Sequence, residues 1–446
     1  MTARAWRDAL RPVAGAVVAV LFAASLVSYV VQISQKGHAS PITDPIDLVA
    51  FYSGGRVLAE RRDPYTVEPL RTCERAALRE SGIAIVPNLV VPAPLPPYAL
   101  ALFSGASLVP FRVASTAFFC ASLFAIGIAI GLTIRLARGP PLVIAGAFVV
   151  ALVFGSLLIG QIVPIVLAAL CASALALRSG RVWLSVICAS LAMLEPHIGA
   201  AALAGIFVTE RRARLPVCAS LVALAALSLA AGGLDRNLEY AFAVLPAHAR
   251  SEISNFYAQY SLTALLYACG VPAQAALRWG EGSYVAAFVC GVAVARKLAK
   301  RYDDTAFAVL APVAFALIGG AFIHIQQMAI ALPLAFLFVR YNREKTLAFA
   351  AVALLAVPWE SLYEIFFYTH VVASGNPAAA LARVSNPGLL ADRVWQVWIE
   401  LIPTRDARTP LQLLLFKLPT WLGLAALALV AVQGSSPVAV RSTIRR

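Results

Sequence analysis

Charged residues are scarce in this chain. Only 13% of its 446 residues are Asp, Glu, Lys or Arg, 61% are hydrophobic, and the mean hydropathy is +0.82. A soluble domain of this length has too little interior to bury so much apolar side chain, which excludes that class. The alternating segments of about ten residues that a membrane barrel needs are also missing. The composition therefore predicts an all-α polytopic membrane protein.

Several catalytic and metal-binding patterns are absent as well. None of the seven cysteines forms a CxxC pair and most lie inside apolar runs, so neither a disulfide framework nor a zinc site is expected. The sequence has no glycine-rich phosphate loop in a strand-turn-helix context, no Ser/His/Asp arrangement and no His/Glu cluster with metal-ligand spacing. These absences predict no metal site and no bound organic cofactor, and they leave a need for a divalent metal open.

The net charge of +14 invites a nucleic-acid interpretation, which the placement of the basic residues disfavours. These residues form short patches between apolar runs, as cytoplasmic loops do under the positive-inside rule. The patches lie in residues 4–11, 211–214, 296–301, 340–343 and 441–446. We therefore expect contact with membrane lipids and no nucleic-acid partner.

The apolar runs predict one bundle of about 10–13 membrane helices that takes up residues 1–446 as a single domain. The predicted spans are residues 12–34, 96–111, 114–134, 141–158, 161–177, 182–208, 214–231, 283–299, 305–322, 326–340, 345–357 and 411–433. The first run is too long for the core of a signal peptide and lacks a cleavage site, so we expect a retained span. Several others fall short of the ~20 residues that cross a bilayer, which is tolerated where a helix lines a cavity.

The basic patches also predict the orientation. An inside N-terminus places the three longest loops, residues 35–95, 232–282 and 358–410, on the outer side. Simple counting of spans puts Arg135, Arg138, Arg178 and Arg181 outside as well, against the positive-inside rule. Either two short runs between residues 96 and 208 re-enter the same face or the rule fails locally, and we expect the second.

The first outer loop begins with a short helix that has an acid near its start. Asp44 and Pro45 suit the N-cap and the first helical position, and Asp63-Pro64 suits a helix end. At about 100° per residue, Asp47 heads an otherwise apolar stripe of Phe51, Gly54 and Leu58. One interpretation is that Asp47 only complements the helix dipole. The other is that Asp47 is a general base on a half-buried helix where the chain leaves the bilayer.

Several motifs carry a resemblance to a known family. The stretch Asp47-Leu-x-x-Phe51-Tyr52-x-x-Gly55-Arg56-x-Leu58, followed by Asp63-Pro64-Tyr65, resembles the first-loop signature of glycosyltransferase family 87. Weaker matches follow at Pro96-Pro97, Gly160-Gln161, Glu195-Pro196, Tyr260-Ser261-Leu262 and His324. This family contains GT-C-class membrane enzymes that use polyprenyl-phosphate sugars, including mycobacterial mannosyltransferases and arabinofuranosyltransferases. The resemblance implies a GT-C-type bundle, a place in cell-envelope assembly, and the role of catalytic base for Asp47.

Three positions depart from the family pattern. Leu95 stands where a tyrosine usually precedes Pro-Pro, and Glu195-Pro196 replaces Lys-Pro. The aspartate that often follows His324 is missing, with Gln326 and Gln327 nearby instead. These changes leave the sugar and the acceptor open more than they affect the reaction class.

The implied reaction moves a hexose or pentose, with mannose favoured, from a polyprenyl-phosphate-sugar donor to a lipid or glycan acceptor. It would take place at the outer face of the cytoplasmic membrane. Such a transfer needs a base for the acceptor hydroxyl and cations for the departing phosphate. Retaining glycosidases need a close pair of carboxyl groups, whereas direct displacement needs one. Because Asp47 is the single strong acidic candidate, we expect inversion.

The remaining candidates are polar residues on the outer side. Guanidinium forks match phosphate oxygens, so the arginines after Asp47 are donor-phosphate candidates, with lipid-headgroup contact as the alternative. The donor-phosphate candidates are Arg56, Arg61, Arg62 and His324, and the substrate-lining candidates are Tyr52, Gln161, Tyr260 and Gln327. Glu195 is interpreted as a structural acid paired with His197. A polar run in the second outer loop is interpreted as a solvated face, with the lining of an acceptor groove as the alternative; it consists of His248, Arg250, Glu252, Asn255 and Tyr260.

Two other functions remain as alternatives. A secondary transporter of a lipid-linked or small sugar commonly has repeated halves with interrupted helices at matching positions. The long loops here are unequally spaced and show no such symmetry. A non-catalytic subunit of an envelope-assembly complex would keep the fold and would need no acid at position 47.

Overall fold

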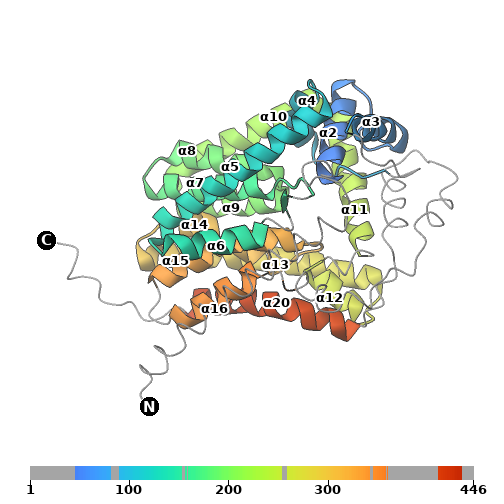
Figure 1. Ribbon diagram of the computed structural model, residues 1–446. Helices are drawn as coiled ribbons and strands as arrows, with labels where there is room; N and C mark the ends of the chain where they lie inside the picture. The colour runs from blue at the N-terminus through green and yellow to red at the C-terminus, as the bar shows by residue number, and fades with distance from the viewer. Residues whose placement is uncertain are drawn as a thin grey trace, which may run out of the picture.

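The described part of the protein is a bundle of helices. The computed structural model describes residues 46–81, 90–152, 156–157, 159–253, 259–341, 345–357, 359 and 410–433 (Figure 1). Within these ranges the chain forms helices and turns, with one isolated antiparallel bridge between Gln259 and His324. The all-α prediction is thereby confirmed. The predicted first span (residues 12–34), Asp44 and nearly all of the third outer loop (residues 358–410) lie outside the described residues.

The helices follow the predicted apolar runs. In chain order they are α2 (Ile46–Ala59), α3 (Val67–Glu80), α4 (Pro97–Ala106), α5 (Phe111–Ala137), α6 (Pro141–Leu152), α7 (Val163–Arg178), α8 (Val182–Leu191), η2 (Ala192–Leu194), α9 (Pro196–Thr209), η3 (Arg211–Ala213), α10 (Arg214–Glu239), η4 (Tyr240–Val244), α11 (Leu245–Glu252), α12 (Leu262–Ala268), α13 (Ala273–Tyr302), α14 (Phe307–Ala316), η5 (Ile325–Ala331), α15 (Leu332–Tyr341), α16 (Lys345–Ala356) and α20 (Pro410–Gln433). Proline begins α4, α6, α9 and α20, where its missing N–H is not needed.

Two predicted spans differ from the structure in extent. The run 96–111 contains only α4, whose 10 residues extend ~15 Å and cannot cross a bilayer. The run 182–208 is interrupted at Glu195, which has an extended backbone between η2 and α9. The following η3 packs against both α8 and α9, so the two helices fold back on each other at Glu195.

The C-terminal ends of α5, α7 and α15 meet at one end of the bundle. The guanidinium groups of Arg178 and Arg340 both donate to the carbonyl of Leu136, at 2.9 and 2.7 Å, and Arg178 pairs with Asp304 at 2.5 Å. Because α4 does not cross and α8 folds back on α9, α5 and α7 end on the same face as the later basic patches. The expected local exception to the positive-inside rule is therefore wrong.

The outer surface of the bundle is apolar. Among the described residues, three helices are long and apolar enough to cross a membrane, namely 111–137, 211–250 and 273–302, and shorter apolar helices pack between them. Large apolar side chains face outward, including Phe124 at 72% and Val222 at 68% exposure. Such a surface is stable against lipid tails and not against water, which agrees with a membrane protein.

Helix α2 packs against α4 at one end of the bundle and is largely buried (Figure 1). The predicted stripe is buried, since Phe51 is 5% and Leu58 7% exposed. At Gly55 a Cβ atom would lie 2.5 Å from the backbone of Phe103, and the Ser104 hydroxyl donates to the Gly55 carbonyl at 2.7 Å. Only glycine permits this close approach of the two backbones, which fixes the position of α2 and of Asp47 at its start.

The Asp63-Pro64-Tyr65 motif attaches the first loop to the bundle. Asp63 pairs with Arg236 of α10 at 2.8 Å, and the Tyr65 hydroxyl donates to the carbonyl of Leu95 at 2.8 Å. The motif thus connects the end of α2 to α10 and to the segment that precedes α4.

Candidate functional site

Asp47 is held at the start of α2 by the turn that precedes α7. Its backbone N–H donates to the carbonyl of Ile159 at 2.9 Å, and its carboxylate accepts a hydrogen bond from the side-chain amide of Gln161. Gly160 between them has φ +74°, a conformation that L side chains rarely adopt. The Gly160-Gln161 motif therefore forms the turn that brings an amide to the carboxylate of Asp47.

The surroundings of Asp47 bring its titration close to neutral pH. Burial raises the pKa of Asp47 from 3.8 to about 7, the hydrogen bond from Gln161 opposes this shift, and the negative charge of Glu252 adds to it. The residue nevertheless stays partly accessible. A carboxylate with such a pKa can accept a proton at neutral pH, as a general base requires.

A second acid, Glu195, lies at the break between η2 and α9. Its carboxylate accepts from the side-chain amide of Gln327 at 3.2 Å and lies 3.8 Å from Nδ1 of His197. The Gln327 amide is also 3.4 Å from the His197 ring. Glu195 thus lies near His197, as predicted, but its hydrogen bond comes from Gln327. The charge of Glu195 also interacts with that of Asp47.

A third acid, Glu252, ends α11 and lies against the bridge between Gln259 and His324. The Gln259 amide is 2.5 Å from the Glu252 carboxylate and 3.1 Å from the His324 ring, which lies 3.7 Å from the same carboxylate. Glu252 and the neighbouring His248 are buried, at 5% and 7% exposure. The prediction of a solvated face is therefore wrong for His248 and Glu252, whose side chains are buried, whereas Arg250 is exposed.

Asp47, Glu195 and Glu252 are together called the acidic cluster. One lysine of the last helix lies beside Gln259, which contacts Glu252 of this cluster. Lys417 of α20 donates to the backbone carbonyl of Gln259 and lies 5.0 Å from the centre of the Tyr260 ring. It is buried, with 3% exposure. A buried cation beside Gln259 can stabilise an anionic group there.

The structure brings some of the predicted site residues together and not others. Gln161 contacts Asp47, Gln327 contacts Glu195, and His324 lies against Glu252. Tyr52 points elsewhere, since its hydroxyl donates to the carbonyl of Val109 at 2.8 Å. Tyr260 is only 1% exposed and serves in packing.

The three predicted arginines lie at the far end of α2. Arg56 follows Asp47 by nine helical residues, which places it ~13 Å further along the axis. Arg56 and Arg62 both pair with Glu60, at 3.3 and 2.5 Å, and they are exposed like Arg61. The structure does not bring these arginines to Asp47, and their phosphate-binding role stays a prediction.

The sequence interpretation missed Lys417 and Gln259. Lys417 carries a visible signal, because a lysine inside an apolar run is costly unless it serves a purpose. Gln259 carries no signal in the sequence, since its place in the site depends on a bridge to His324, which is 65 positions away. Within the described ranges, no group of three or more His, Cys, Asp or Glu residues has a geometry that could hold a metal ion.

The described residues thus form an apolar helical bundle, typical of a membrane protein, with Asp47, Glu195 and Glu252 in its interior. The model of glycosyltransferase family 87 matches residues 95–319, about half of the chain, and the chain belongs to that family. The match includes Gln161, Glu195 and Glu252 and begins after Asp47. No curated protein and no solved structure matches the chain. The protein is thus a membrane glycosyltransferase, with a sugar donor and an acceptor as substrates.

Proposed function

We propose that the protein transfers a sugar, with mannose favoured, from a polyprenyl-phosphate-sugar donor to a lipid or glycan acceptor. The observation that carries this proposal is Asp47, an acid with a pKa of about 7 that is held by Gln161 and interacts with the charges of Glu195 and Glu252. The donor tail would lie in the bilayer, and its sugar would reach the polar cluster inside the bundle.

In the proposed step Asp47 acts as general base. Its carboxylate takes the proton of the acceptor hydroxyl while the hydroxyl oxygen forms a bond to the anomeric carbon of the donor sugar. The bond from this carbon to the phosphate oxygen breaks, and polyprenyl phosphate leaves with the electron pair. The leaving group is a stable anion, so the step needs no general acid and no organic cofactor. Activity in the presence of EDTA tests whether a divalent metal is needed.

Lys417 and His324 are the proposed partners of the departing phosphate. Both contact Gln259, which in turn contacts Glu252, so a phosphate bound beside them would lie within the same cluster as the base. The arginines of α2 would then contact lipid headgroups. This proposal replaces a role for Arg56 at Asp47, because the rise of α2 separates the two.

The stereochemical outcome depends on how many acids take part. The charges of Glu195 and Glu252 both interact with that of Asp47, so Asp47 is not the single acid of the site that the sequence indicated. We still propose inversion with Asp47 as the base, because Glu252 is buried against Gln259 and Glu195 is held by Gln327, while Asp47 is partly accessible and heads the first-loop motif. The anomeric configuration of the product tests this directly.

We also propose that the site faces the outer side of the cytoplasmic membrane. The acidic cluster lies at the opposite end of α7 and α15 from the contacts that Arg178 and Arg340 make with Leu136. Basic ends of membrane helices remain in the cytoplasm.

The test of the proposed function is product formation by the full-length protein in lipid. Purified protein receives polyprenyl-phosphate-mannose and a lipid extract, and mass spectrometry follows the gain of one hexose by an acceptor. Polyprenyl-phosphate-arabinofuranose serves as the pentose comparison. Failure with both donors would contradict the proposed donor class.

A further inference from the structure

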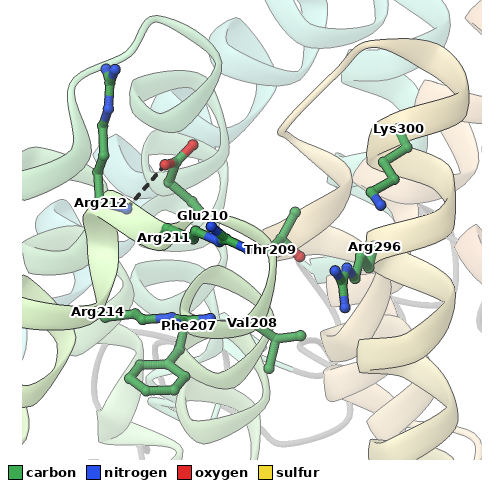
Figure 2. Close-up of a pocket in the computed structure, with 9 residues that line it drawn as sticks. All are labelled: Phe207, Val208, Thr209, Glu210, Arg211, Arg212, Arg214, Arg296 and Lys300. Carbon is green, nitrogen blue, oxygen red and sulfur yellow. Dashed lines mark hydrogen bonds between the residues drawn. The ribbon is translucent and has the colours of Figure 1, made fainter.

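A cavity of about 500 Å³ lies at the end of the bundle away from the acidic cluster. The end of α9, η3, the start of α10 and the last turns of α13 line it (Figure 2). Along α9, thirteen residues separate Thr209 in this cavity from Pro196 beside Glu195, a distance of ~20 Å. The cavity is therefore separate from the proposed sugar-transfer site.

The walls of the cavity are strongly basic. Its cations are Arg211, Arg212, Arg214, Arg296 and Lys300, and its one acid is Glu210. The Glu210 carboxylate accepts from the backbone N–H of Arg212 at 3.1 Å and caps η3 (Figure 2). In the described part of the chain, no carboxylate forms an ion pair with Arg211, Arg296 or Lys300. So many like charges in one cavity repel one another unless an anion compensates them.

A hydroxyl group in the cavity wall has no partner. The Thr209 Oγ1 atom is buried and forms no hydrogen bond in the described part of the protein. Figure 2 shows its oxygen on the side that faces Arg296 of α13. A buried hydroxyl without a partner costs free energy, and a bound oxygen acceptor would remove that cost.

The cavity also has an apolar border. Phe207 and Val208 line it, and Leu215 in the first turn of α10 is 73% exposed. The Arg214 guanidinium lies 5.6 Å from the centre of the Phe207 ring. Basic groups next to exposed apolar side chains suit a ligand with an anionic head and a hydrocarbon tail.

We propose that this cavity binds the phosphate group of an anionic phospholipid. Arg296, Lys300 and Arg211 surround the phosphate with charge-assisted hydrogen bonds, and Thr209 donates to one of its oxygens. The acyl chains run along the exposed apolar surface beside Leu215. A free phosphate would satisfy the same donors but would gain nothing from that surface.

The test compares two double variants of the full-length protein that remove the same charge from the same helix. Arg296→Gln with Lys300→Gln changes the cavity, and Lys297→Gln with Arg301→Gln changes cations of α13 that do not line it. Native mass spectrometry measures phosphatidylglycerol retained from detergent micelles that contain equal amounts of phosphatidylglycerol and phosphatidylcholine. We expect the cavity variant to bind phosphatidylglycerol about thirtyfold more weakly, because each cation near an anionic headgroup contributes roughly a fivefold factor. For the control variant, the logarithm of the change in phosphatidylglycerol affinity should be less than half of that for the cavity variant.

Thr209→Val adds a second variant with little change in shape. It should weaken phosphatidylglycerol retention severalfold, whereas a purely structural threonine would leave retention unchanged. Equal losses in the two double variants, or equal retention of the two lipids by the wild type, would overturn the proposal. Displacement of phosphatidylglycerol by equimolar inorganic phosphate would also overturn it and would assign the cavity to a soluble phosphate.

Discussion

The side-chain amide of Gln161 donates a hydrogen bond to the carboxylate of Asp47, although the two residues are 114 positions apart in the chain. The same turn accepts the Asp47 N–H at Ile159, so the backbone and the side chain of Asp47 are fixed together. The hydrogen bond from Gln161 limits how far burial raises the pKa of Asp47.

The first prediction concerns the pH dependence of the reaction. The base must be ionised, so kcat/KM should fall as the pH drops below about 7, the pKa of Asp47. In Gln161→Leu the ionised form of Asp47 loses a hydrogen bond of roughly 1.5–3 kcal/mol. The acidic limb of the pH–rate profile, where kcat/KM falls, should therefore move up by about 1–2 pH units. In Glu252→Gln a nearby negative charge disappears, so the limb should move down.

These opposite shifts distinguish a titrating Asp47 from a general loss of structure. The measurement is a pH–rate profile for the wild type and both variants with saturating acceptor. Profiles that move in the same direction would assign the titration to another group.

The second prediction concerns the donor phosphate. Lys417→Gln should raise the donor KM by about ten- to hundredfold, because a charge-assisted hydrogen bond contributes roughly 1.5–3 kcal/mol. Arg56→Ala is the comparison, and we expect little change because α2 places Arg56 ~13 Å from Asp47 along its axis. The reverse result would return the phosphate role to the arginines of α2.

The third prediction concerns the contact between α2 and α4. Gly55→Ala places a methyl group 2.5 Å from the Phe103 backbone and should destabilise the protein by about 1–3 kcal/mol. Gly127→Ala is the control, because no atom beyond the backbone of its own helix lies within 4 Å of the added carbon. Thermal unfolding in one detergent–lipid mixture measures both variants, and equal midpoints would argue against a tight contact at Gly55.

Much of the fold follows from the sequence because helix formation in a bilayer is dictated locally. Each long apolar run must form a helix to satisfy its backbone in lipid, and the prolines mark where α4, α6 and α9 begin. The break at Glu195 has a visible cause in Glu195-Pro196, but periodicity alone did not show that the chain reverses there. That reversal depends on the packing of α8 against α9, which no local pattern encodes.

The site was only partly predictable for a similar reason. Asp47 and Gln161 lie in motifs that a reader of the sequence can find, whereas the burial of Glu252 depends on a bridge between two distant loops. The arginines of α2 are the opposite case, because the sequence predicted them near the site and the structure places them away from it. They are close to Asp47 in sequence, yet the rise of the helix carries them away from it.

The fourth prediction concerns topology. A cysteine at Ser81, after α3, should react in intact cells with an impermeant thiol reagent, on a background with the seven native cysteines replaced. A cysteine at Ser179, after α7 at the basic end, should react only after the membrane is opened. Labelling of Ser179→Cys in intact cells would restore the simple count of spans and contradict the arrangement of Arg178 with Asp304.

The last prediction tests the role of Asp47. Asparagine keeps the shape of Asp47 and can still accept from Gln161, but it cannot take a proton. Burial raises the pKa of Asp47, so its ionised form destabilises the folded protein above pH 3.8. The Asp47→Asn variant should therefore unfold at the same or a higher temperature than the wild type at pH 8, which separates a catalytic defect from misfolding. Asp44→Asn, three residues earlier in the same loop, is the control and should keep nearly full activity.

The most direct measurement is the turnover of Asp47→Asn with saturating polyprenyl-phosphate-sugar in lipid. Loss of a general base lowers the rate by about 10²–10⁴, so we expect turnover to fall by at least a hundredfold while donor binding is unchanged. Turnover above about a tenth of the wild-type value would contradict the account, and Glu195 and Glu252 would become the next candidates for the base.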